Sequence, residues 1–76
     1  MNTILIIDDE EKIRNLLSKI ISLEGFEVLQ AGDIKSGLRK MDTSEIDVVI
    51  CDVKLPDGSG VDATKTIKDK FPAVEV

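Results

Sequence analysis

Residues 3–9 read T-I-L-I-I-D-D, an apolar run that ends on two carboxylates, and residues 46–52 read I-D-V-V-I-C-D and end on a third. Apolar, β-branched runs of this kind are typical of strands buried on both faces of a parallel sheet. Ligands of open α/β sheets bind at the carboxyl ends of the strands. The two runs therefore predict strands over 3–7 and 46–51, and Asp8, Asp9 and Asp52 should converge if these strands are neighbours.

The segment between the two runs predicts a helix, a strand and a second helix. Apolar residues at helical spacing form one stripe, which consists of Ile13, Leu16, Leu17, Ile20 and Ile21. Gly25 stands where a left-handed residue would end this helix, and residues 26–31 are expected to form an edge or half-exposed strand. Asp33 is placed to cap the second helix, marked by Ile34, Leu38 and Met41. Its interior Gly37 makes that helix depend on tertiary packing.

The segment after Asp52 predicts a loop, a third helix and the start of another strand. Residues 55–60 read L-P-D-G-S-G, which indicates an irregular loop because Pro fixes φ and Gly permits positive φ. A helix is expected over 61–70, with an inner face of Val61, Thr64, Ile67 and Phe71. Pro72 should stop it, and residues 73–76 begin a strand. The alternation of strands and helices predicts an α/β fold with a parallel sheet.

Composition limits the possible functions. The chain has 76 residues, of which 42% are apolar and 33% charged, so it holds one small domain or part of one. No apolar run approaches the roughly 20 residues of a membrane helix, and we expect a soluble, cytoplasmic protein without membrane contact. The single Cys51 excludes an intramolecular disulfide, and the absence of His excludes zinc sites and His-dependent catalysis.

The acidity of the chain is local. Its formal charge is −5, and residues 8–11 contribute four of the 15 acidic residues, so the charge outside that run is −1. An acidic chain without Trp or Tyr lacks the basic patch and stacking platforms of nucleic-acid-binding proteins, and no direct nucleic-acid contact is expected. Carboxylates held close together repel one another unless a cation neutralises them. Mg²⁺ fits this cluster because it takes oxygen ligands and binds through few carboxylates while keeping waters.

At I-L-I-I-D-D-E (4–10) and C-D-V-K-L-P-D-G-S-G (51–60), the sequence closely resembles the receiver domain of two-component response regulators. The combination is specific, because an acidic pair follows the first strand and an Asp follows the third, with Leu-Pro and Gly shortly after it. The resemblance implies a flavodoxin-like, doubly wound parallel sheet with strand order 2-1-3-4-5. It also implies a phosphoacceptor, not a turnover enzyme, that takes a phosphoryl group from a sensor histidine kinase and switches an output module outside this chain.

The resemblance implies a role for each motif residue. Asp52 would be the phosphoacceptor and would form an aspartyl phosphate. Asp9 would ligate Mg²⁺ directly and Asp8 mainly through water, and the metal would also contact Asp52 and the backbone carbonyl of Lys54. The loop beside the acceptor would be shaped by Pro56, Gly58 and Gly60.

The chain matches the first three-fifths of the family's domain, so residues 1–76 are interpreted as a partial receiver domain that stops at or inside the fourth strand. In the family, a Ser or Thr after the fourth strand and a Lys after the fifth contact the phosphoryl group, and both are absent here. The family pattern does not support Lys54, Lys65 or Lys68 as a substitute for that lysine. An effector domain would lie C-terminal in the parent protein. Without the family's last helix, we expect exposed apolar surface beside the 13–21 stripe, and hence self-association or strand exchange.

Two other functions stay open. A pseudo-receiver would keep the fold as an interaction module without phosphorylation. A Mg²⁺-dependent phosphohydrolase with an Asp nucleophile would resemble D-x-D, whereas residues 52–54 read D-V-K. The L-P-D-G-S-G loop is compatible with a regulator of transcription. The neighbouring residues have simpler interpretations. Glu10 and Glu11 are expected to be acids in the first turn of a helix, Cys51 a buried thiol and Asp57 a turn residue.

Overall fold

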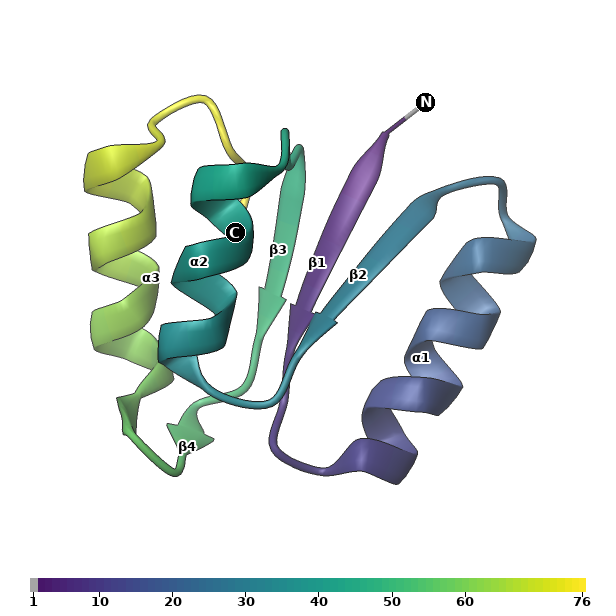
Figure 1. Cartoon of the computed structure of the whole chain (residues 1–76), viewed down its shortest axis with the longest axis horizontal. Coiled ribbons are helices and arrows are strands. Elements are labelled where there is room, and N and C mark those ends of the chain that lie inside the picture. The colour runs from purple at the N-terminus through teal and green to yellow at the C-terminus, as the bar shows by residue number, and fades with distance from the viewer. Residues whose placement is uncertain (1) are drawn as a thin grey trace.

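The computed structural model describes residues 2–76 as a parallel sheet with helices on both faces (Figure 1). The elements follow one another as β1 (Thr3–Ile7), α1 (Glu11–Leu23), β2 (Glu27–Ala31), α2 (Ile34–Thr43), β3 (Val48–Cys51), β4 (Lys54–Leu55), β5 (Gly58–Ser59) and α3 (Gly60–Lys70). This order confirms the predicted α/β class. Within residues 2–76, none of the helices has the length and apolar character needed to cross a bilayer.

The main sheet has the strand order β2-β1-β3, and both pairings are parallel. β1 is the central strand because it is apolar on both faces, and its residues 4–7 are all buried. In the register, Leu5 lies between Leu29 and Val49. The order matches the first three positions of 2-1-3-4-5, which confirms the flavodoxin-like topology and the predicted neighbourhood of the two acid-terminated strands.

One face of the sheet carries the hydrophobic core beneath α2 and α3, which lie side by side in Figure 1. α2 comes so close to β1 that a Cβ on Gly37 would lie 2.6 Å from Cδ1 of Ile7. This approach explains the glycine, whose helix-propensity cost of about 1 kcal/mol is offset by packing. The core cluster consists of Leu5, Ile7, Ala31, Met41, Ile46, Val49, Ile67 and Val74.

The opposite face is contacted by α1. Arg14 of α1 reaches Gln30 of β2, and the register aligns Gln30 with Ile6 and Ile50 on this face. No residue of α1 is buried, and the large apolar side chains exposed on α1 and β3 are Ile13 (46%), Leu16 (59%), Ile20 (52%), Leu23 (85%) and Ile50 (40%). The expected exposed apolar surface is therefore present, whereas self-association stays a prediction.

The segment after Asp52 is more regular than the predicted loop over 55–60. Residues 54–59 form an antiparallel hairpin, in which Lys54 faces Ser59 and Leu55 faces Gly58. Pro and Gly in a short run are typical of tight hairpin turns as well as of irregular loops, and the loop prediction missed this alternative.

Three element boundaries correct the prediction, and the first is that of β2, which begins at Glu27 rather than at residue 26. β3 begins at Val48 rather than at residue 46, and the side chain of Asp47 accepts a hydrogen bond from the Thr3 amide at 2.8 Å. α3 begins at Gly60, and Val61 is 55% exposed although it was expected on the inner face. The buried residues of this helix are spaced by three and four positions, and they are Gly60, Ala63 and Ile67.

The strand expected over 73–76 is reduced to one parallel bridge between Val48 and Glu75. The bridge lies beside β3 on the side away from β1, which is the place of a fourth strand in the predicted order. Pro72 follows the end of α3, as expected. Lys68 holds the segment in place, because its Nζ donates a hydrogen bond to the Val74 carbonyl at 2.7 Å.

Candidate functional site

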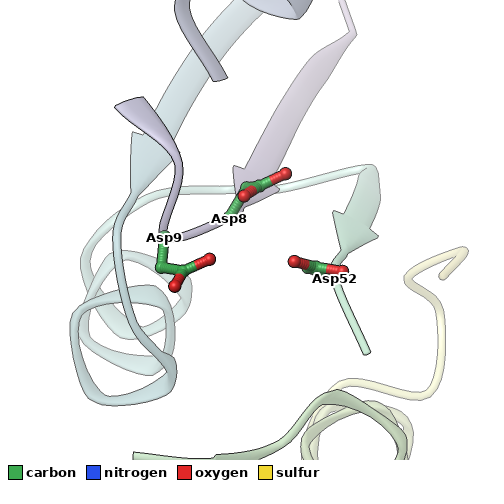
Figure 2. Close-up of side chains that lie close together, drawn as sticks. All are labelled: Asp8, Asp9 and Asp52. Carbon is green, nitrogen blue, oxygen red and sulfur yellow. The ribbon is translucent and has the colours of Figure 1, made fainter. Parts of the chain in front are cut away.

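Three carboxylates meet at one edge of the sheet. Ile7 and Cys51 are the last paired residues of β1 and β3, so the residues that follow them, Asp8 and Asp52, leave the sheet together. The amide of Asp52 still donates to the Ile7 carbonyl at 2.9 Å, which extends the ladder by one bond. Asp9 lies in the turn towards α1. Figure 2 shows the carboxylates of Asp9 and Asp52 facing one another, with Asp8 at the same edge.

The spacing of these carboxylates suits a hard cation. Each offers one oxygen, and the three oxygens lie within 4.8 Å of one another. Two ligands on opposite sides of an octahedral Mg²⁺ are about 4.2 Å apart, since each metal–oxygen distance is about 2.1 Å. The limit of 4.8 Å is close to this separation, so the three oxygens fit around one Mg²⁺ that they ligate directly or through bound water. An all-oxygen, anionic donor set favours Mg²⁺ over softer metals.

Backbone hydrogen bonds orient two of the carboxylates. Oδ1 of Asp8 accepts from the Glu10 amide at 2.9 Å, and Oδ1 of Asp52 accepts from the Val53 amide at 2.8 Å. Each of these carboxylates keeps its second oxygen for a ligand. Asp8 is half-buried, whereas Asp9 and Asp52 are exposed. The carboxylate of Asp52 is therefore accessible from solvent.

Arg14 braces the β1 end of the site. Its Nη1 donates to the backbone carbonyl of Asp8 at 2.8 Å, and its Nε donates to Oε1 of Gln30 at 2.9 Å. Both bonds are partly buried, and the rigid fork of the guanidinium makes both from one side chain. No local pattern marks Arg14, because a charged residue beside an apolar helical stripe is normally solvated. Through it, α1 is tied to the strand end that carries the acidic pair.

Two glycines shape the segment beside Asp52 in different ways. Gly58 has a φ of +151°, which side-chain-bearing residues rarely adopt. Gly60 does not use the positive φ that a glycine permits. It is needed for close approach instead, because a Cβ there would overlap the Asp52 carbonyl oxygen and lie 2.7 Å from the carbonyl carbon. The Gly60 amide also donates to the Val53 carbonyl at 2.7 Å.

The remaining motif residues lie in or next to the hairpin. Lys54 opens β4 two residues after Asp52, and the proposed ligation by its carbonyl stays a prediction. Pro56 stands in the hairpin turn. Lys68 does not reach towards Asp52 as a substitute for the family's lysine, because its Nζ bonds the carbonyls of Pro72 and Val74.

Asp57 makes a contact that turn chemistry did not predict. Its Oδ1 accepts from the Ile34 amide at 2.9 Å and its Oδ2 from the Lys35 amide at 3.0 Å. These hydrogen bonds, first that from Ile34 and then that from Lys35, lower the pKa of the Asp57 carboxyl below its ordinary value. The hairpin is thereby joined to the first turn of α2. A local sequence pattern cannot reveal such a bond, since it depends on how the fold places two distant segments.

Of the residues beside the acids, Glu11 has the role expected of it, whereas Cys51 is half-buried rather than buried and Glu10 precedes the first turn of α1. Burial raises the pKa of the Cys51 thiol, and the negative charges of Asp52 and Asp8 raise it further. The thiol therefore stays protonated at neutral pH, where a protonated thiol is a poor nucleophile. Glu11 lies in the first turn of α1, and Glu10 is its N-cap residue. Acidic residues are favourable at this end of a helix dipole.

The fold and the acidic edge agree with one family. Residues 4–76 match the family described as response regulator receiver domain, and the chain belongs to it. Members of this family are signalling domains of two-component systems. The predicted resemblance is thus confirmed over nearly the whole chain.

Relatives support this membership. The chain is similar to the transcriptional regulatory protein CpxR of Escherichia coli K12, with 37% identity over 68 residues, which are 90% of this chain and 29% of CpxR. It is similar to TrrA of Thermotoga maritima, solved in complex with Mg²⁺ and BeF, with a TM-score of 0.90, 35% identity and coverage of 95% of this chain and 63% of that one. A structure of the histidine kinase ThkA in complex with TrrA matches with a TM-score of 0.91, 34% identity and coverage of 97% of this chain and 64% of that one. The chain therefore spans less than two-thirds of these receiver structures and less than a third of CpxR.

Proposed function

We propose that this chain carries the phosphoacceptor site of a two-component response regulator, with Asp52 as the acceptor. The observation that carries the proposal is the meeting of Asp8, Asp9 and Asp52 within 4.8 Å at the carboxyl ends of β1 and β3, in a member of the receiver family. A carboxylate oxygen of Asp52 would bond to phosphorus while the P–N bond of a phosphohistidine breaks. The products would be an aspartyl phosphate and an imidazole, whose nitrogen takes up a proton.

In this proposal Asp8 and Asp9 hold Mg²⁺ beside Asp52, and the backbone carbonyl of Lys54 is a further ligand. When bound, Mg²⁺ offsets the repulsion between the carboxylate and the anionic phosphoryl group and stabilises the charge that develops in transfer. The chain preorganises its own part of the site. The Glu10 amide orients Asp8, and the Val53 amide orients Asp52. The segment beside the acceptor is shaped by Pro56, Gly58 and Gly60.

We propose that residues 1–76 are part of a receiver domain. Its phosphodonor would be a sensor histidine kinase, and its output would be an effector domain of the parent protein. The ThkA–TrrA complex supports the first partner, and the name of CpxR favours transcription as the output. Phosphorylation would add about −1.5 to −2 charges at Asp52, which can bias a two-state element. We place the transfer in the cytoplasm, where a kinase draws on ATP. The exposed apolar face of α1 is a surface for self-association or strand exchange.

Incubation of the 76-residue chain with acetyl phosphate and Mg²⁺ tests the proposal. The intact mass should gain one phosphoryl group, and hydroxylamine should release it, as expected for an acyl phosphate. The Asp52→Asn variant and a sample with a chelator should gain nothing. The matched control is Asp42→Asn, which removes the same charge from the exposed end of α2 and should be labelled like the wild type. Labelling of Asp52→Asn would overturn the assignment of the acceptor.

Other results would favour the two rival functions. A wild-type chain that binds Mg²⁺ but forms no acid-labile phosphate would favour the pseudo-receiver interaction module. Steady turnover of p-nitrophenyl phosphate, lost in Asp52→Asn, would favour the Asp-nucleophile phosphohydrolase.

A further inference from the structure

The first turn of α2 is capped by two carboxylates from different parts of the chain. Asp33, its own N-cap residue, accepts from the Ser36 amide at 2.7 Å. Asp57, from the turn between β4 and β5, accepts from the amides of Ile34 and Lys35 at 2.9 and 3.0 Å. A helix start leaves about four amides without an intrahelical partner, and the two side chains satisfy three of them. The hairpin thus supplies most of the cap of a helix more than 20 residues earlier.

The tip of the hairpin also packs against α2. A Cβ on Gly58 would lie 3.2 Å from Cδ1 of Ile34, which is tighter than an ordinary contact. A side chain at residue 58 would therefore require the end of the Ile34 side chain to shift by a few tenths of an ångström. At the tip, the Asp57 carboxylate reaches the α2 amides, and the adjacent Gly58 has no side chain that would crowd Ile34. Figure 1 shows β4 next to the end where α2 begins.

The base of the hairpin is anchored to the acceptor itself. The Gly60 amide donates to the Val53 carbonyl at 2.7 Å, and the Val53 amide donates to Oδ1 of Asp52 at 2.8 Å. A Cβ on Gly60 would lie 3.0 Å from the Cα of Val53. The ends of segment 53–60 are thus joined to each other and to Asp52. In the middle of the segment, Leu55 packs against the core, Gly58 lies close to Ile34, and the Asp57 carboxylate supplies the hydrogen bonds to α2.

We propose that Asp57 is a positioning residue of the acceptor site. By capping α2, it holds segment 53–60 in place and so sets where the backbone of Lys54 lies relative to Asp52. Asp57 does not belong to the acidic cluster, and its two carboxylate oxygens accept from amides of α2. The consequence for the metal rests on the proposed function, whereas the tie between the hairpin and α2 does not. Linkage makes the coupling reciprocal, so metal binding should also strengthen the cap.

Amide NMR of three variants tests this role. Asp57→Ala removes both acceptor oxygens, Asp57→Asn keeps one, and the control Asp42→Asn removes the same charge from the exposed C-terminal end of α2. Without metal, the amide resonances of Ile34 and Lys35 should move upfield in the Asp57 variants. Hydrogen-exchange protection of the Gly60 amide should fall about fivefold in Asp57→Ala, the scale of a lost helix cap, and less in Asp57→Asn. The control should match the wild type.

A Mg²⁺ titration of the same samples tests the consequence for the site. The Kd for Mg²⁺ should rise about fivefold in Asp57→Ala and about twofold in Asp57→Asn, because the weakened cap is linked to ligand placement. If Asp57→Ala unfolds, the Kd of Asp57→Asn for Mg²⁺ tests the positioning role on its own.

Each possible failure has a distinct meaning. Equal Gly60 protection in the Asp57 variants and in Asp42→Asn would overturn the tie itself. Reduced protection with an unchanged Kd for Mg²⁺ would overturn the positioning role. A wild-type chain that shows the tie between the hairpin and α2 but does not bind Mg²⁺ would overturn the proposed function. The positioning role would be overturned with it, whereas hydrogen exchange would still measure the tie.

Discussion

Gly60→Ala tests how the acceptor backbone is built. A Cβ at residue 60 would overlap the carbonyl oxygen of Asp52, lie 2.7 Å from the carbonyl carbon and lie 3.0 Å from the Cα of Val53. Because ordinary contacts begin at 3.4 Å, the two backbone segments must separate by at least 0.7 Å. No side-chain rotation can relieve this clash, since every atom in it belongs to the backbone.

The steric cost should outweigh the gain in helix propensity. An added methyl group in a packed site costs about 1–3 kcal/mol even where side chains can adjust. Replacing Gly by Ala in a helix recovers at most about 1 kcal/mol, and less at the first residue. We therefore expect Gly60→Ala to lower the free energy of unfolding by about 2 kcal/mol. That is a large share of the roughly 4–11 kcal/mol typical for a chain of this length.

Urea unfolding followed by far-UV circular dichroism measures the effect, with Gly32→Ala as the matched control. A Cβ on Gly32 meets Nη1 of Arg14 at 3.4 Å, an ordinary contact with the end of a flexible side chain. The control should stay within about 0.5 kcal/mol of the wild type. Gly60→Ala should also bind Mg²⁺ more weakly, because Asp52 moves with its backbone. Equal stability of the two glycine variants would refute the reasoning.

Gly37→Ala should destabilise the chain by about 1 kcal/mol, because its Cβ would lie 2.6 Å from Cδ1 of Ile7. Ile7→Val removes that atom, so a double-variant cycle in urea should show favourable coupling, and strict additivity would contradict the contact. Asp33→Ala should cost about 1 kcal/mol through loss of the α2 N-cap, and a cost no greater than that of Asp42→Ala at the other end of this helix would argue against the cap. Because hydrogen bonds lower the pKa of Asp57, its stabilising effect is complete above the ordinary pKa of aspartate and is lost as pH falls through the lowered value. An NMR titration should place the Asp57 midpoint below that of an unstructured aspartate, and a midpoint at or above it would contradict the bonds to α2.

The central features of the fold were predictable because their signals are local. Residues 3–7 are apolar without alternation, which requires burial on both faces, and they form the central strand. Asp33 and Gly25 occupy the two positions where helix ends have strong residue preferences, and both serve there as expected. The convergence of Asp8, Asp9 and Asp52 followed from parallel pairing of two strands that end on acids.

The features that escaped prediction depend on contacts between distant segments. Arg14 reaches the Asp8 carbonyl, and Asp57 reaches the start of α2, but an exposed charged residue has the same local pattern whether or not a partner lies nearby. Val61 was assigned to the inner face of α3 because it is apolar, whereas the inner face begins at Gly60, which lies against the Asp52 backbone. The hairpin over 54–59 was missed because Pro and Gly mark a change of direction without specifying its geometry.

A two-dimensional amide NMR titration with Mg²⁺ tests the central claim most directly, namely that Asp8, Asp9 and Asp52 form one cation site. Saturable shifts confined to residues near the carboxyl ends of β1 and β3 are predicted for the wild type, together with their loss in Asp9→Asn. Shifts that do not saturate, that spread over the acidic surface, or that persist in Asp9→Asn would contradict the claim.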